Sequence, residues 1–100
     1  MPPRPYRKEK LGHIIHEVLA EYLARNFSAD GALVTITDVQ MEKDALHANV
    51  KVGIIPFEKA PEVWKELEDR KGEFEHMLLK KMRARVVPHL SFVIDNPGAL

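Results

Sequence analysis

The segment LVTITDVQMEKDALHANVKVGII, residues 33–55, contains two runs of β-branched residues separated by a short polar break. The first run, residues 33–41, is typical of a strand. The second run alternates between two faces, with Ala48, Val50, Val52 and Ile54 on one and His47, Asn49 and Lys51 on the other. Strands so close in sequence are most simply the two arms of an antiparallel hairpin.

An amphipathic helix is expected before this hairpin. From Leu11 the apolar residues recur at i, i+3, i+4 and i+7, which predicts a helix that ends near Asn26. Residues 1–10 are instead rich in cations and interrupted by proline, so they predict a basic N-terminal arm.

A second helix is expected after the hairpin. Pro61 suits the first turn of a helix, and the apolar spacing carries that helix to about Lys71. Its buried stripe is expected to contain Val63, Trp64 and Leu67.

Beyond Lys71 the sequence predicts another helical stretch and a third strand. Gly72 is either a kink in one long helix or the joint between two, and the helical pattern continues to about Val86. HLSFVID, residues 89–95, alternates again and predicts the strand, which leaves residues 96–100 as a short C-terminal end. The order α-β-β-α-(Gly72)-α-β predicts one α+β domain over residues 11–95, with its helices on one face of a three-stranded sheet.

Composition excludes several classes of protein. The 100 residues include 15 basic and 15 acidic side chains, so the formal net charge is zero and a histone-like polycation is excluded. Cysteine is absent, which excludes a disulfide scaffold, a thiolate zinc site and a cysteine nucleophile. No apolar run has the length of a signal peptide core or a membrane span, so we expect a cytoplasmic protein.

Charge is unevenly placed along the chain. Residues 1–10 hold Arg4, Arg7, Lys8 and Lys10 against one acid, and residues 80–85 hold Lys80, Lys81, Arg83 and Arg85 with none. The two basic clusters could form one phosphate-binding surface, or they could be ordinary solvated helix ends. On a helical wheel, Lys80 and Arg83 point away from the apolar stripe and Lys81 and Arg85 towards it, so the first two are the better phosphate contacts.

Catalytic and metal-binding patterns are weak. His13 and His16 lie one helical turn apart and could share a metal, but two ligands do not make a structural zinc site. The sequence contains no nucleophile elbow, P-loop or dinucleotide fingerprint. We therefore expect neither an enzyme nor a cofactor, and a metal-dependent hydrolase built on the histidines is the remotest alternative.

Two longer stretches match a known pattern. ITDVQMEKDALHANVKV, residues 36–52, holds Val39, Asp44, Ala48, Val50 and Val52 in register. KGEFEHMLLKKMRARVVPHLSFVID, residues 71–95, holds Gly72, Arg83, Arg85, Val87, Pro88, Leu90, Phe92 and Asp95. Together they resemble the bacterial ribosome-binding factor A family over nearly the whole chain.

This resemblance implies a K-homology (KH) domain of the second topological type, in which a helix and a strand precede a βααβ core. It implies a monomeric, non-catalytic factor that binds the 30S subunit and 16S rRNA during late maturation and matters especially in the cold. The RNA-binding residues implied are Arg4, Arg7 and Lys10 in the arm, and Arg70, Lys71, Gly72, Lys80, Arg83 and Arg85 in the helix pair. The sequence departs from the family at Arg70, where the family has alanine, and at Glu75, where many members have arginine.

An alternative from another class is a protein–protein adaptor. Residues 58–75 contain seven acids, and the predicted helix 61–71 lies within this acidic segment. Such a surface would suit a basic partner, for example a ribosomal protein or another assembly factor.

Overall fold

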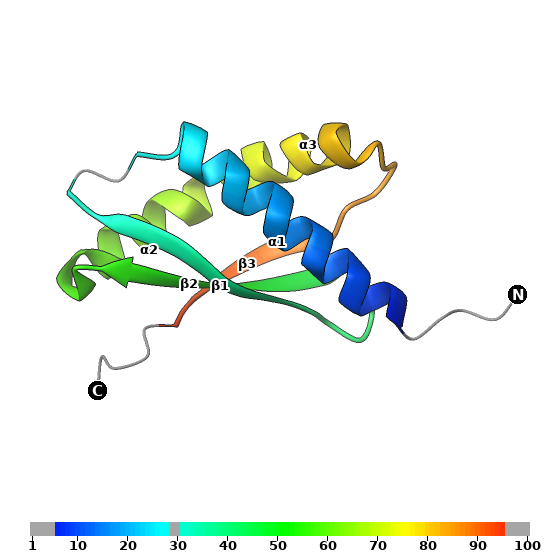
Figure 1. Cartoon of the computed structure of the whole chain (residues 1–100), viewed down its shortest axis with the longest axis horizontal. Helices are drawn as coiled ribbons and strands as arrows, with labels where there is room; N and C mark the ends of the chain where they lie inside the picture. The colour runs from blue at the N-terminus through cyan, green and yellow to red at the C-terminus, as the bar shows by residue number, and fades with distance from the viewer. Residues whose placement is uncertain (1–5, 29–30, 96–100) are drawn as a thin grey trace, which may run out of the picture.

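Figure 1 shows a computed structural model of the chain, which describes residues 6–28 and 31–95, with side chains from Lys10 onward. In this described part, three helices lie on one face of a three-stranded sheet. The helices are α1 (Tyr6–Asn26), α2 (Ala60–Asp69) and α3 (Lys71–Met82), with a short 3-10 turn, η1 (Phe57–Lys59), before α2. The strands are β1 (Leu33–Met41), β2 (His47–Ile55) and β3 (His89–Ile94). The predicted α+β class and order of elements are confirmed.

The sheet has the order β1-β2-β3. β1 and β2 pair antiparallel, as the hairpin prediction required, with one register shift between Ile36 and Asp38. β3 pairs parallel to β2. A parallel neighbour cannot be reached by a tight turn, so the chain crosses over through α2 and α3 before it returns to the sheet.

The core lies between the helices and the inner face of the sheet. The apolar residues predicted for one face of β2, from Ala48 to Ile54, are all fully buried. Phe74 of α3 is central to this core: its ring meets Tyr22 at 6.0 Å and Phe92 at 5.9 Å in edge-to-face geometry. Such pairs contribute about 0.5–1.5 kcal/mol in addition to the free energy of burying their surface. The Phe74 side chain therefore links α1, α3 and β3.

Two helix boundaries differ from the predicted ones. α1 begins at Tyr6, so residues 6–10 of the predicted arm are helical, whereas Arg4 lies outside the described residues. α3 ends at Met82 rather than near Val86, because Arg83 adopts the left-handed conformation with φ of 52° and closes the helix. The helical-wheel positions assigned to Arg83 and Arg85 therefore do not apply.

α2 and α3 are two separate helices, and the joint between them lies at Arg70 rather than at Gly72. Arg70 is both the C-cap of α2 and the N-cap of α3, with φ of −100° and ψ of 11°. Gly72 is inside the first turn of α3, and a Cβ added there would meet no atom within 4 Å. Neither its conformation nor its surroundings therefore require glycine.

Trp64 is less buried than its place in the apolar stripe suggested. Its two predicted neighbours, Val63 and Leu67, are buried, but Trp64 is 39% exposed. None of the described helices is both long and apolar enough to cross a membrane.

Candidate RNA-binding surface

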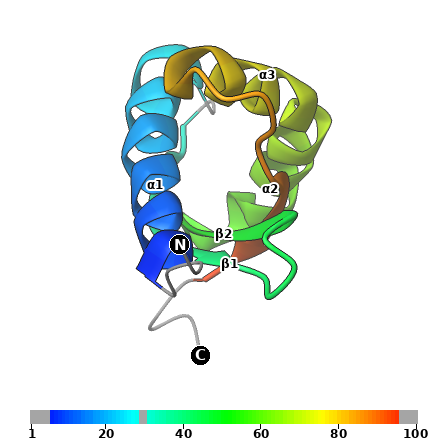
Figure 2. The ribbon, with the colours of Figure 1, turned by 90° about the vertical axis from the view of Figure 1, so that its right-hand side faces the viewer.

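The beginning of α1 and the end of α3 lie at the same end of the molecule (right side of Figure 1; facing the viewer in Figure 2). The exposed cations at this end are Lys10, Lys80, Lys81, Arg83 and Arg85, and we name this set the basic end. Arg7 belongs to α1, but its side chain lies outside the described part. Two clusters far apart in sequence thus lie at the same end of the molecule.

Cations of the basic end are available for an external partner. Residues 80–86 contain no acid, and within the described residues Lys80, Lys81, Arg83 and Arg85 form no salt bridge. Lys81 and Arg85 are exposed as well, although the helical wheel placed them towards the apolar stripe. A phosphate could bind here without breaking an existing ion pair, which favours binding.

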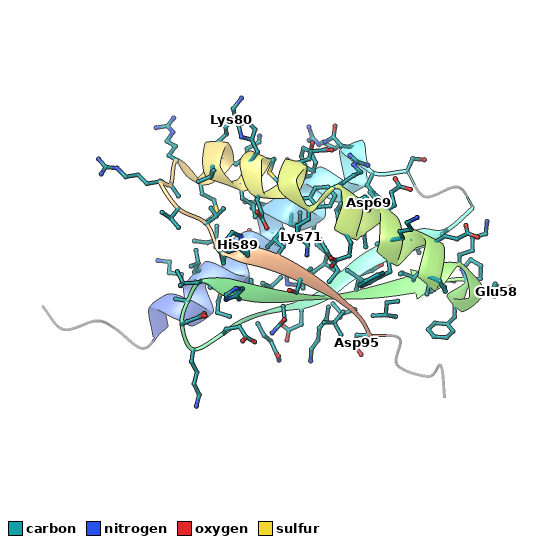
Figure 3. The ribbon with its side chains drawn as sticks, turned by 180° about the vertical axis from the view of Figure 1, so that it is seen from behind. Glu58, Asp69, Lys71, Lys80, His89 and Asp95 are labelled. Atoms are coloured by element: carbon teal, nitrogen blue, oxygen red, sulfur yellow. The ribbon has the colours of Figure 1, made fainter. Side chains whose placement is uncertain are left out.

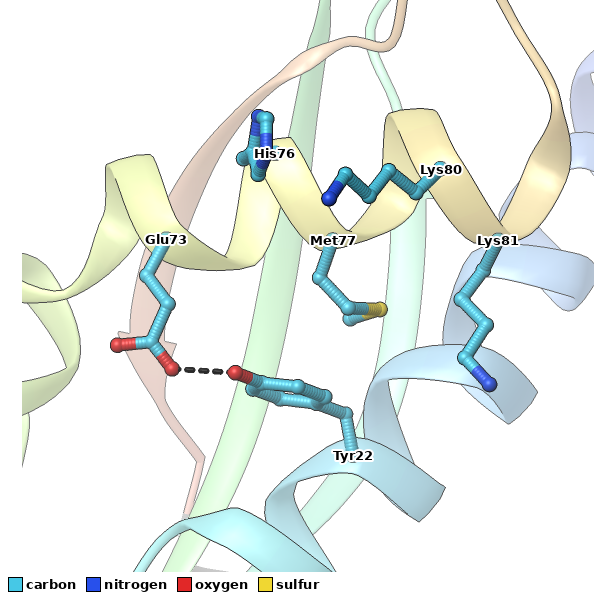
Figure 4. Close-up of a pocket in the computed structure, with 6 residues that line it drawn as sticks. All are labelled: Tyr22, Glu73, His76, Met77, Lys80 and Lys81. Carbon is cyan, nitrogen blue, oxygen red and sulfur yellow. Dashed lines mark hydrogen bonds between the residues drawn. The ribbon is translucent and has the colours of Figure 1, made fainter.

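A shallow groove of about 310 Å³ runs between α1 and α3 beside the basic end (Figure 4). Its lining residues are Tyr22, Glu73, His76, Met77, Lys80 and Lys81. A second hollow shares Tyr22, Met77 and Lys81 and extends the groove to Arg25. Lys81 and Arg25 were not predictable as groove residues, because only the packing of α1 against α3 brings them together.

Arg70 is turned towards the protein. Its Nε and Nη2 donate to the two carboxylate oxygens of Glu73 at 3.0 and 2.8 Å, and Nη2 also donates to the Asn26 carbonyl at 3.2 Å. Its guanidinium carbon lies 5.3 Å from the Phe27 ring centre and 5.5 Å from that of Phe74. Arg70 therefore ties α1 to the helix pair at the joint, and its contact with RNA stays a prediction.

The same contacts shift three pKa values. Hydrogen bonds from Arg70 and then from Tyr22 lower the pKa of the Glu73 carboxyl to about 2. The bond to Glu73 raises the pKa of the Tyr22 hydroxyl, which donates to that carboxylate. The pKa of Arg70 is raised as well, again chiefly by its hydrogen bonds to Glu73. All three shifts favour the protonation states that hold the joint together at neutral pH.

The other predicted residues at the joint are surrounded by acids. Lys71 pairs with Glu68 at 2.7 Å, and Gly72 is exposed. The acids between residues 66 and 75 are Glu66, Glu68, Asp69, Glu73 and Glu75. The structure therefore separates the predicted RNA-binding residues into the basic end and a joint whose local charge is unfavourable for phosphate.

Two of these acids cap the outer edge of β3. Glu75 Oε2 accepts a hydrogen bond from the Leu90 N–H at 2.9 Å, and Glu68 Oε2 accepts one from the Phe92 N–H at 3.1 Å. Trp64 Nε1 donates to the Phe92 carbonyl at 2.7 Å. The edge strand therefore has side-chain partners in place of a fourth strand, which gives a structural reason for a carboxylate at position 75.

Two of the histidines pair with an acid nearby in the sequence. His13 pairs with Glu17 at 2.6 Å, and His47 pairs with Asp44 at 2.9 Å. The Leu46 N–H, and after it the His47 side chain, lower the pKa of the Asp44 carboxyl. Among residues 10–28 and 31–95, no three potential ligands are grouped so that they could hold a metal ion.

The topology and the charge distribution define a KH-like α+β domain with one strongly basic end. Residues 7–98 match the profile of the family described as ribosome-binding factor A. The chain belongs to the ribosome-binding factor A family.

Relatives and solved structures agree with this assignment. Ribosome-binding factor A of Coprothermobacter proteolyticus is 29% identical over 94 residues, which cover 93% of this chain and 69% of that protein. The solution structure of a Thermotoga maritima protein that is described as a candidate ribosome-binding factor A has a TM-score of 0.76 at 28% identity, and the match covers 100% of this chain and 97% of that protein. The Thermus thermophilus factor, fitted as a homology model into a cryo-electron-microscopy map of a complex with the 30S subunit, has a TM-score of 0.73 at 21% identity, with coverage of 88% and 94%. At that identity the last likeness concerns the fold alone.

Proposed function

We propose that this chain binds the 30S ribosomal subunit through 16S rRNA during late maturation of the subunit, as a monomer in the cytoplasm, and that it makes or breaks no covalent bond. The observation that carries the proposal is the basic end, where exposed cations of α1 and of residues 80–85 lie at the same end of the molecule and residues 80–86 contain no acid. The fit of a related factor into a map of a 30S complex supports the choice of partner.

The contacts divide into a principal and a secondary set. Lys10, Lys80, Arg83 and Arg85 are the principal phosphate contacts, and Arg4 and Arg7 extend them along the N-terminal segment. Lys71 and Gly72 form the secondary set, because Lys71 would exchange its bond to Glu68 for one to RNA and Gly72 leaves open space for a backbone.

Binding of this kind depends on charge and shape. Each phosphate that a cation neutralises releases counterions, so affinity falls steeply with salt. Cations on a rigid helix end select RNA of matching backbone geometry, and they can stabilise one conformation of the rRNA over another. The protein therefore acts by stabilising one conformation of the rRNA.

The test is co-sedimentation of the purified protein with 30S subunits, 50S subunits and 70S ribosomes over a salt series. We expect selective, salt-sensitive binding to 30S. The Lys80→Glu/Arg83→Glu variant should lose that binding, whereas Lys65→Glu, which reverses an exposed cation on α2, should retain it. Equal binding to all three particles, or full binding by the double variant, would contradict the proposal.

A further inference from the structure

Three large apolar side chains are exposed together at the end of the molecule away from the basic end. Leu33 is 62%, Ile55 64% and Phe57 50% exposed. Leu33 and Ile55 are direct partners in the β1–β2 register, so their side chains stand next to each other on one face of the sheet. Phe57 begins η1 two residues after Ile55. The three lie at the same end of the molecule, and we name them the apolar patch.

On the outer face of β1 and β2, the apolar patch adjoins polar residues. By strand alternation, Ile55 shares the outer face of β2 with Asn49 and Lys51, away from the helices. On β1 the outer neighbours of Leu33 include Thr35 and Gln40, which are also polar. Grouped exposed apolar side chains with a polar surround are typical of a site that a partner covers.

Acids adjoin the patch. Glu58 follows Phe57 directly, and Glu62 lies one helical turn further on in the first turn of α2; both are exposed. Neither forms a salt bridge within the described residues. Residues 56–69 contain five acids, Glu58, Glu62, Glu66, Glu68 and Asp69, against Lys59 and Lys65, a balance of −3. Figure 3 shows Glu58 and Lys80 at opposite ends of the molecule.

We propose that Leu33, Ile55, Phe57, Glu58 and Glu62 form a docking surface for a basic protein segment, in which lysine or arginine residues alternate with apolar ones. Apolar side chains of the segment would cover the patch, and its cations would pair with Glu58 and Glu62. RNA is disfavoured here because the acids repel phosphate. A two-fold dimer through this surface is disfavoured because it would set the same acids against each other.

The first experiment uses two synthetic twelve-residue peptides, one of alternating leucine and lysine and one of alternating leucine and glutamate. Amide chemical shifts of the full chain are followed as each peptide is added. We expect the lysine peptide to shift residues of β1, β2 and η1 around the patch, and the glutamate peptide to leave them unchanged. Shifts confined to other residues, or equal binding of both peptides, would overturn the proposal.

Substitutions in the docking surface test which residues contribute to binding of the lysine peptide. Phe57→Ser with Glu62→Lys should weaken the lysine peptide roughly tenfold or more, since apolar anchors at an interface centre commonly carry that much. Val86→Ser is the matched control, because Val86 is exposed beyond the end of α3. Unchanged affinity of the double variant would contradict the proposal, as would self-association in sedimentation equilibrium that Phe57→Ser abolishes.

A photo-crosslinking residue at position 57 extends the test to the ribosomal particle. We expect an adduct with a basic protein of the 30S subunit, and we expect RNA adducts when the same group is placed at position 86. This docking surface does not rest on the proposed RNA contact. Peptide binding without 30S association would remove only the proposed function, whereas 30S association with no peptide binding and no protein adduct at position 57 would remove only the docking surface.

Discussion

Arg70 contacts a carboxylate, a backbone carbonyl and two aromatic rings that belong to different parts of the chain. Its side chain is only 26% exposed, so these contacts are partly shielded from water. Arg70 thus has a structural role in this protein, because its guanidinium joins α1 to α2 and α3.

Replacement of Arg70 tests this assignment. Arg70→Ala should lower the free energy of unfolding by about 2 kcal/mol, because it removes several hydrogen bonds and leaves Glu73 without its cation. Urea denaturation of the wild type and the variant measures the difference. Arg85→Ala is the control and should leave stability unchanged, since Arg85 is exposed and unpaired within the described residues. Loss of 30S binding with undiminished stability would return Arg70 to the RNA-binding set.

Glu73 gives the junction a dependence on pH. Its pKa falls from an ordinary value of 4.5 to about 2 on folding. A lowered pKa means that the stabilising effect is complete above pH 4.5 and is lost as the pH falls towards 2. We expect the wild type to lose more stability than Glu73→Gln between pH 5 and 2 in thermal denaturation. Parallel losses in the two proteins would contradict this origin of the effect.

α3 has a first turn that tolerates a side chain. Gly72 is helical, and an added Cβ would meet nothing within 4 Å. Gly72→Ala should therefore stabilise the protein by about 0.5–1 kcal/mol, through the higher helix propensity of alanine. Thermal denaturation measures this gain. If Gly72→Ala weakens 30S binding, the absence of a side chain at position 72 allows RNA to approach closely. If binding is unchanged, Gly72 is not one of the secondary RNA contacts.

β3 depends on carboxylates at its outer edge. Glu75→Ala removes the acceptor of the Leu90 N–H, so we expect hydrogen exchange at that amide to accelerate. The Phe92 amide, which donates a hydrogen bond to Glu68, is the internal control and should exchange at the same rate as in the wild type. Acceleration at both amides would mean that Glu75 holds the whole strand rather than one bond.

The distribution of charge over the whole domain matters more than its net value of zero. Lys80 lies towards one end and Glu58 of η1 lies at the other, with Asp69 of α2 between them (Figure 3). A steering field of this kind would orient the protein as it approaches rRNA.

The salt dependence of 30S binding measures how many cations contact phosphate. In a plot of log K against log salt concentration, Lys80→Ala and Arg83→Ala should each reduce the slope by about one unit. Lys65→Ala should not change it. A slope that neither substitution at the basic end alters would place the contacts elsewhere on the molecule.

The pattern of side chains was sufficient to predict the hairpin, the helix pair and the third strand. Alternation in residues 47–54 and helical spacing from Leu11 are local properties, and burial follows them directly. The end of α3 was not predictable in the same way, because Arg83 closes the helix in a conformation that usually selects glycine or asparagine.

The partners of charged residues were the least predictable feature. Arg70 and Lys80 are both cations that precede a lysine in the sequence. Arg70 is held by Glu73 and Asn26, whereas Lys80 is exposed. The difference depends on how α1 crosses the helix pair, which is a tertiary property. The capping of β3 by Glu75 was hidden for the same reason, since its partner amide is fifteen positions away.

Trp64 is the single tryptophan of the chain, and its indole donates to the Phe92 carbonyl while one side of the ring meets water. The intrinsic fluorescence of the protein therefore reports whether α2 is seated against β3. Circular dichroism, by contrast, is dominated by all the helices together. If the emission changes before the ellipticity during denaturation, the last strand detaches while the helices persist, and coincident curves mean that the domain opens as one cooperative unit.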